Sequence, residues 1–162
     1  MLLYRVLRKA HARNPFDGQG AFLVGGRWSS PGVRLSYASE HQSLAMLEYF
    51  VHLDSEDAPS DLVLAIAELP DDIAAERITA EALPPDWRDS PAPPSLSEIG
   101  NSFVKRGEHV ALAVPSALAP SENNWLINPA HVDFESVIVR ATEPLRYDTR
   151  MFRPRHPSRK KK

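Results

Sequence analysis

Several side chains combine a residue type that can do chemistry with an informative position. Arg27 follows two adjacent glycines, which allow the main chain to bend sharply or to approach another group closely. Its planar guanidinium could bind a phosphate or carboxylate with two hydrogen bonds. Tyr37 stands at the end of an expected strand, where its ring could stack on a planar ligand. Ser116 follows an apolar strand and a proline and could present its hydroxyl in a cleft. Their ordinary alternatives are a solvated arginine, a core tyrosine and a turn-forming serine.

Glu48 is the strongest candidate for a catalytic role. In an expected helix it lies within the arc of the apolar residues, roughly 40° from the direction of Leu44 and 60° from that of Val51 at about 100° per residue. Burying an unpaired carboxylate costs free energy. The Glu48 side chain must therefore either have a hydrogen-bond or ion-pair partner or serve a function that requires its charge. The ordinary alternative is a partly exposed glutamate paired with His52, one helical turn further on.

An asparagine-rich segment, residues 122–129, adds a fifth candidate region. It contains Asn123, Asn124 and Asn128, whose amides readily hydrogen-bond to backbone groups. Its simplest role is to hold a long loop in shape.

Motifs for several other chemistries are missing from the sequence. Gly18-Gln19-Gly20 lacks the third glycine and the strand-turn-helix setting of a dinucleotide fingerprint, and there is no Walker-type loop. The six histidines stand singly, so we expect no metal site. The absence of cysteine excludes disulfides, thiolate catalysis and zinc-cysteine sites. Ser102 and Lys105 match a bare S-x-x-K pattern, but without its companion motifs.

The charge of the chain is unevenly distributed. The 162 residues carry a formal net charge of -2, but seven of the 19 basic residues lie at 150–162. Residues 1–149 therefore hold 12 basic and 21 acidic residues, a net charge of -9. Such an acidic body disfavours nucleic-acid binding, which needs basic side chains gathered on a folded face. We expect one catalytic domain over residues 1–149 and a flexible basic C-terminal tail over 150–162.

Length and composition predict a folded, soluble protein. The 43% hydrophobic and 25% charged residues are typical of globular domains. No apolar run approaches the roughly 18 residues of a membrane-spanning helix, and the first residues do not form a signal peptide. We therefore expect a cytoplasmic location and no membrane partner.

Local patterns predict an α+β domain, with six or seven short strands and two helices unevenly interspersed. One helix is expected over 40–53, capped by Ser39 with Gln42, and another from the Ser95 and Glu98 capping box to a C-cap at Gly107. Residues 84–94, with five prolines, and 119–131 are expected to be loops. We expect strands at residues 2–7, 33–37, 61–69, 77–79, 110–114, 137–139 and 145–147.

Five short motifs follow one another along the chain in a recognisable order. They are Gly26-Arg27-Trp28 followed by Gly32, Tyr37-Ala38-Ser39, Ala45 with Glu48, Val114-Pro115-Ser116, and Glu122-x-Asn124-x-Leu126-x-Asn128-Pro129-x-His131. Together they resemble the RES-domain family, named for an arginine, a glutamate and a serine, over about residues 3–148.

The resemblance assigns roles to individual residues. By the residue-by-residue match, Arg27, Glu48 and Ser116 form the naming trio, Tyr37 is a further active-site residue and Asn124 is another matched position. Val132 departs from the pattern, because proline is expected after the histidine, but it leaves the trio untouched.

The family implies a fold like that of ADP-ribosyltransferase toxins, a small twisted β core with flanking helices and a cleft that binds NAD as substrate without a metal. It also implies a toxin of a type II toxin-antitoxin system, in a multimeric complex with an Xre-like antitoxin. Relatives hydrolyse or phosphorolyse NAD, and some transfer ADP-ribose to a protein. The sequence does not decide between water, phosphate and a protein as the acceptor, and the alternative is a non-catalytic module that binds an antitoxin-like partner.

The implied roles agree with the chemistry of these side chains. Glu48 would stabilise positive charge on the ribose, and Arg27 would bind the diphosphate or orient the nicotinamide ribose. Tyr37 would pack against the nicotinamide ring, and Ser116 would hydrogen-bond to ribose or amide groups.

Overall fold

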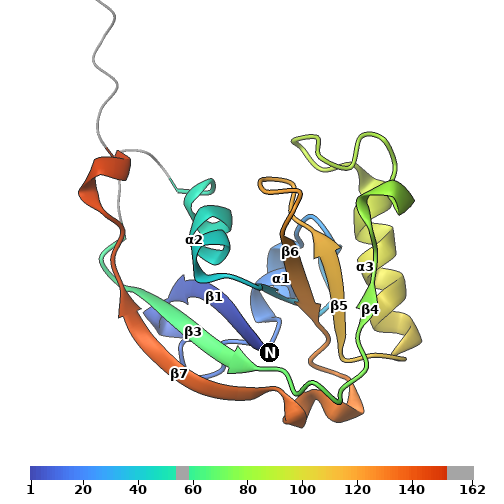
Figure 1. Ribbon diagram of the computed structural model, residues 1–162, viewed down its shortest axis with the longest axis horizontal. Helices are drawn as coiled ribbons and strands as arrows, with labels where there is room; N and C mark the ends of the chain where they lie inside the picture. Colours follow the sequence, from blue (N-terminus) through green and yellow to red (C-terminus); the bar gives the residue numbers. More distant parts are fainter. Residues whose placement is uncertain (54–58, 153–162) are drawn as a thin grey trace, which may run out of the picture.

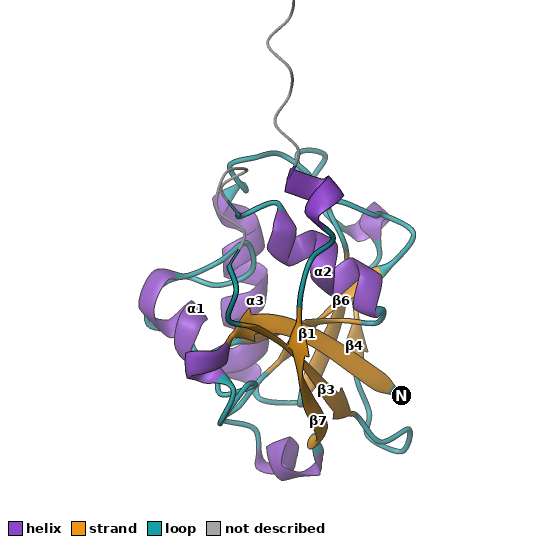
Figure 2. Ribbon diagram, turned by 90° about the vertical axis from the view of Figure 1, so that its left-hand side faces the viewer, coloured by secondary structure: helices purple, strands orange, loops and turns teal. Residues whose placement is uncertain are grey.

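The computed structural model describes residues 1–53 and 59–152, which form one mixed seven-stranded sheet with helices packed around it (Figure 1). The strand order is β4-β5-β6-β2-β1-β3-β7, and the pairs are antiparallel except for β4 with β5. Figure 2 shows the strands fanning out with the twist usual for sheets. The predicted α+β class and single-domain architecture are confirmed.

Strands and helices are unevenly interspersed along the described part of the chain. The strands are β1 Leu2–Arg8, β2 Ser36–Ser39, β3 Leu62–Glu68, β4 Glu76–Arg77, β5 Ala111–Pro115, β6 Asn123–Ile127 and β7 Ile138–Leu145. The helices are α1 Gln19–Val24, α2 Gln42–Phe50 and α3 Pro94–Arg106, with short 3-10 helices at Lys9–His11, Ala80–Ala82, Val132–Ser136 and Thr149–Phe152.

Helix α3 packs tightly against the loop that carries Arg27. Trp28 is 2% exposed and belongs to the same apolar cluster as Leu96 and Phe103 of α3. Gly100 lies at the contact, where an added Cβ would stand 1.8 Å from the Trp28 carbonyl oxygen. Only a glycine allows the helix to approach this loop so closely.

Helix α2 lies beside β1 and β2, and a separate apolar cluster holds it there. Its residue Ala45 packs with Val6 of β1 and with Leu62 and Leu64 of β3. The C-terminal part of the chain adds a contact, because the Tyr147 hydroxyl donates to the Met46 carbonyl at 2.6 Å. These contacts fix the helix that carries Glu48.

The expected loop at 119–131 is wrong in part, because it contains strand β6. The backbone of Asn123–Ile127 pairs with β5 on one side, and most of it pairs with β2 on the other. Trp125, Leu126 and Ile127 are buried, so burial between two strands outweighs the turn preference of the asparagines. The two prolines of the segment flank the strand rather than interrupt it.

Other element boundaries also differ from the predictions. The two last expected strands are one continuous strand, β7. This strand tolerates Pro144 because an edge strand forms backbone hydrogen bonds to a neighbouring strand on one side only. Strand β2 begins at Ser36 rather than at residue 33, and the short helix α1 was not expected. The strands β1 and β3 are confirmed to within one residue at each end.

Both predicted capping boxes are wrong. Helix α2 begins after His41 and α3 after Pro93, and neither N-cap side chain makes a capping hydrogen bond. Ser39 lies in strand β2 instead. The C-cap at Gly107 is confirmed, since its φ of 60° lies in the left-handed region.

The 3-10 helix Thr149–Phe152 crosses the expected domain boundary at residue 149, and its Phe152 ring packs against Phe50 of α2 at a centroid distance of 5.3 Å. Residues 153–162 of the expected tail lie outside the described residues. No helix in residues 1–53 and 59–152 has the length and hydropathy needed to span a membrane.

We predict that Gly100→Ala lowers the free energy of unfolding by about 2–3 kcal/mol, because α3 or the Trp28 backbone must move to admit the methyl group. The matched control is Gly20→Ala, since an added Cβ there meets nothing within 4 Å. Urea unfolding of both variants measures the difference. Equal stability of the two variants would contradict the close contact.

Candidate active site

Glu48 is the centre of a hydrogen-bond network that joins three elements. It is half-buried on α2, and its Oε1 accepts a hydrogen bond from Ser116 Oγ at 2.7 Å and from Asn124 Nδ2 at 2.5 Å. Within the described residues these two side chains, rather than His52, are its hydrogen-bond partners. Its second oxygen, Oε2, has no hydrogen-bond partner among the described residues.

Ser116 anchors the carboxylate rather than lining an open cleft. The residue is 0% exposed, and its Oγ accepts hydrogen bonds from the N–H groups of Leu118 and Ala119, at 3.1 Å each, while donating to Glu48. The hydroxyl therefore forms the turn after β5 and holds Glu48 with the same atom. Its hydrogen-bonding capacity is fully used within the protein.

Asn124 connects Glu48 to strand β2. Its Nδ2 donates to Glu48, while its Oδ1 accepts a hydrogen bond from Ser39 Oγ at 2.7 Å. Ser39 is 3% exposed and stands opposite Asn124 in the register of β2 and β6. The network thus runs from Ser39 through Asn124 to Glu48 and ends at Ser116.

Tyr37 lies two residues before Ser39 on β2, so the two side chains are on the same face of the strand. Its hydroxyl accepts a hydrogen bond from the Trp28 N–H at 3.1 Å and lies 2.8 Å from Ser29 Oγ. Burial raises the pKa of Tyr37, so the phenol stays protonated at neutral pH. Gly26 permits this placement, since an added Cβ would lie 2.7 Å from the Tyr37 hydroxyl.

Arg27 is half-buried and anchors the proline-rich loop. Its Nη1 donates to the Trp87 carbonyl at 2.8 Å and its Nη2 to the Asp89 carbonyl at 3.1 Å. Its positive charge acts on the nearby Tyr37 hydroxyl. These two bonds leave Nε and one hydrogen on each terminal nitrogen free to bind a further acceptor.

A second arginine near Tyr37, Arg5 of β1, was missed by the sequence analysis. Its Nη1 donates to Ser36 Oγ at 3.0 Å and to the Tyr37 carbonyl at 2.8 Å, while its buried Nε has no hydrogen-bond partner within the described residues. Burial lowers the pKa of Arg5, but an arginine still carries its charge at neutral pH. The available signal was an arginine in the middle of a largely apolar strand, with a second one, Arg8, at its end.

The structure therefore brings the predicted residues together in two connected groups. Glu48, Ser116 and Asn124 contact one another, and Arg27 lies beside Tyr37. Strand β2 links the groups. None of the five predicted site residues lines the groove of about 670 Å³ between β4, α3 and the 3-10 helix at Ala80–Ala82, or the 60 Å³ cavity beside Arg5.

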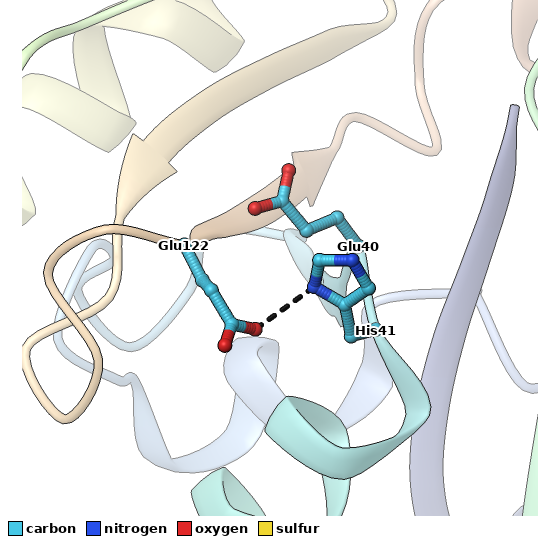
Figure 3. Close-up of side chains that lie close together, drawn as sticks. All are labelled: Glu40, His41 and Glu122. Atoms are coloured by element: carbon cyan, nitrogen blue, oxygen red, sulfur yellow. Dashed lines mark hydrogen bonds and ion pairs between the residues drawn. The ribbon is translucent and has the colours of Figure 1, made fainter.

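The sequence did not predict a cluster of possible metal ligands at the start of α2, formed by Glu40, His41 and Glu122 (Figure 3). Their ligand atoms lie within 4.8 Å of one another. His41 Nδ1 is 2.9 Å from Glu122 Oε2, and the Glu40 carboxylate accepts hydrogen bonds from the backbone and side chain of Asn123. These contacts join the beginning of α2 to the beginning of β6.

Comparisons with known proteins show which family this chain is similar to. Residues 2–148 match the sequence model of the RES domain. The chain is 34% identical over 147 residues to "Toxin Res" of Yersinia enterocolitica, covering 91% of this chain and 95% of the relative. It is 36% identical over 147 residues to the "Prs ADP-ribosylating toxin" of a Sphingobium species, covering 90% of this chain and 91% of the relative.

A solved structure shares the fold. It is the crystal structure of the Mycobacterium tuberculosis MbcT-MbcA toxin-antitoxin complex, matched with a TM-score of 0.70 and 19% sequence identity. The match covers 90% of this chain and 84% of that chain.

We predict that Ser116→Ala lowers the free energy of unfolding by about 1–3 kcal/mol, because it removes the acceptor of the Leu118 and Ala119 N–H groups and one of the two donors to Glu48. Ser97→Ala is the matched control, since the Ser97 hydroxyl makes one exposed hydrogen bond to the Pro94 carbonyl. Chemical unfolding of the two variants tests this. A loss no greater than that of the control would mean that Ser116 does not anchor the site.

Proposed function

The chain belongs to the RES domain family, and from this premise we propose that it is the NAD-consuming toxin of a toxin-antitoxin system. The observation that supports this best is the Glu48 carboxylate, with one oxygen held by Ser116 and Asn124 and the other unoccupied. The names of the related toxins, one of them ADP-ribosylating, support the same activity.

Glu48 would act on the nicotinamide–ribose bond of NAD. As this bond breaks, positive charge develops on the ribose, and a fixed carboxylate stabilises that charge without having to reorient. Ser116 and Asn124 both bind Oε1, so Oε2 is the oxygen that would face the sugar. Ser116 would therefore act through Glu48, since its own hydroxyl is buried.

Two arginines would recognise the negative diphosphate. Because residues 1–149 carry a net charge of -9, the domain as a whole does not attract an anion, and local donors must do so. Arg5 and Arg27 both act electrostatically on the Tyr37 hydroxyl, and Arg5 also donates a hydrogen bond to the Tyr37 carbonyl. The Tyr37 hydroxyl is already hydrogen-bonded, so its ring is the part offered to nicotinamide.

The released ADP-ribose would pass to water, phosphate or a protein. These reactions share the Glu48 step and differ in what reaches the exposed face of the sugar. Incubation of a lysate with labelled NAD separates them, since label on a protein band shows transfer and label only in small molecules shows degradation.

The proposed partner is an Xre-like antitoxin in a multimeric complex. The likeness of this chain to one component of a solved toxin-antitoxin complex supports an antitoxin partner. A carboxylate of such a partner would compete with the diphosphate for the remaining N–H groups of Arg27.

We predict that Glu48→Gln lowers the rate of nicotinamide release from NAD by at least about 100-fold, because the amide keeps the shape of the side chain but removes its charge. Glu98→Gln, an exposed change on α3, is the control and should leave the rate unchanged. Chromatography of the products measures both rates. Full activity of Glu48→Gln, or intact NAD with the unaltered protein, would overturn the proposal and favour a non-catalytic binding module.

We also predict that Arg5→Lys and Arg27→Lys each raise the KM for NAD about tenfold with a smaller change in kcat, because lysine keeps the charge but loses the planar fork. The control is Arg106→Lys on α3, whose arginine pairs with Glu76 away from Tyr37. Steady-state kinetics of the three variants test this. An unchanged KM for both Arg5→Lys and Arg27→Lys would show that the diphosphate does not bind at this part of the protein.

A further inference from the structure

Three consecutive residues, the last of β2 and the two that follow it, each contact one residue at or just before the start of β6. Ser39 donates to the side chain of Asn124, Glu40 accepts from Asn123, and His41 pairs with Glu122. Figure 3 shows the last of these pairs, with Glu40 beside it. We name residues 39–41 and 122–124 the β2–β6 clamp.

The clamp continues the strand pairing toward Glu48. The backbone register ends at Ser39 opposite Asn124, and one further backbone hydrogen bond joins the Glu40 N–H to the Asn123 carbonyl at 3.2 Å. Beyond it, the Glu40 carboxylate accepts from the Asn123 N–H at 2.7 Å and from its Nδ2 at 3.1 Å. These bonds hold the backbone of Asn123, next to Asn124, against the connection between β2 and α2.

The orientation of the Asn124 amide decides what it offers to Glu48. An asparagine amide has a donor end and an acceptor end, and only the donor end, Nδ2, stabilises a carboxylate. The acceptor end, Oδ1, receives the Ser39 hydroxyl at 2.7 Å in a site where Ser39 is 3% exposed. A buried acceptor without this donor would be unsatisfied and free to turn toward another group.

We propose that Ser39 is a positioning residue for the catalytic carboxylate. By holding Asn124 Oδ1, it keeps Nδ2 on Glu48 Oε1 and leaves Oε2 directed to the ribose. Ser39 touches neither Glu48 nor the substrate, and it acts through Asn124 alone. This inference rests on the proposed NAD cleavage.

The test is a double-mutant cycle on nicotinamide release with the full chain. Ser39→Ala should lower kcat about fivefold, the effect of losing one hydrogen bond, with little change in the KM for NAD. Asn124→Ala should lower kcat at least as much. In the Asn124→Ala background, Ser39→Ala should cost less than about twofold, because its effect passes through the missing amide.

A matched control and a stability measurement separate positioning from folding. Ser136→Ala removes a hydroxyl that donates to the Asp133 carbonyl in a 3-10 helix away from the network, and it should leave kcat unchanged. Thermal unfolding shows that each variant is folded at the assay temperature. A merely structural role of Ser39 would give the same loss of kcat with and without Asn124.

The outcomes also distinguish this inference from the proposed function. If Glu48→Gln and Asn124→Ala lower kcat but Ser39→Ala does not, or if the two losses multiply, the positioning role is wrong and NAD cleavage stands. If Glu48→Gln retains full activity, the proposed function itself fails.

Discussion

The arrangement of this molecule depends on holding one carboxylate partly out of water. A half-buried Glu48 is tolerable only with donors to replace the lost solvent, and they come from Ser116 and Asn124. These donors stand after β5 and on β6, while Glu48 stands on α2, so they meet only because β5, β6 and β2 are neighbours in the sheet. Sheet order and helix packing thus determine the chemistry of a single side chain.

A second constraint is electrostatic. In the proposed function, an acidic body has to recognise the NAD diphosphate through a few local cations, and the fold places Arg5 and Arg27 near Tyr37. Neither is simply solvated: Arg27 holds carbonyl groups of the proline-rich loop, and Arg5 lies against β2. Cations that are already fixed by backbone acceptors lose little side-chain entropy when an anion binds. The hydrogen bonds of Arg27 to the loop and of Arg5 to β2 would therefore also prepare the proposed anion site.

The sequence predicted the parts that depend on local pattern. The α+β class, the ends of β1 and β3, the C-cap at Gly107 and the inward side of α2 that carries Glu48 all follow from periodicity and turn chemistry. It did not predict β6, because Asn123 and Asn124 read locally as turn formers and become strand residues only through pairing on both sides. Ser39 was assigned to a helix cap for the same reason, since its partner lies 85 residues away.

Long-range partners also explain why the roles of the site residues required the structure. A motif names Ser116 and Asn124 but does not say whether their polar atoms face a ligand or one another. The structure shows Ser116 fully buried and its hydroxyl satisfied, so the carboxylate is divided between two duties. Oε1 is bound by Ser116 and Asn124, whose hydrogen bonds stabilise the fold, and Oε2 is the oxygen proposed to act on the substrate. A preorganised carboxylate of this kind stabilises developing positive charge without first releasing a protein partner.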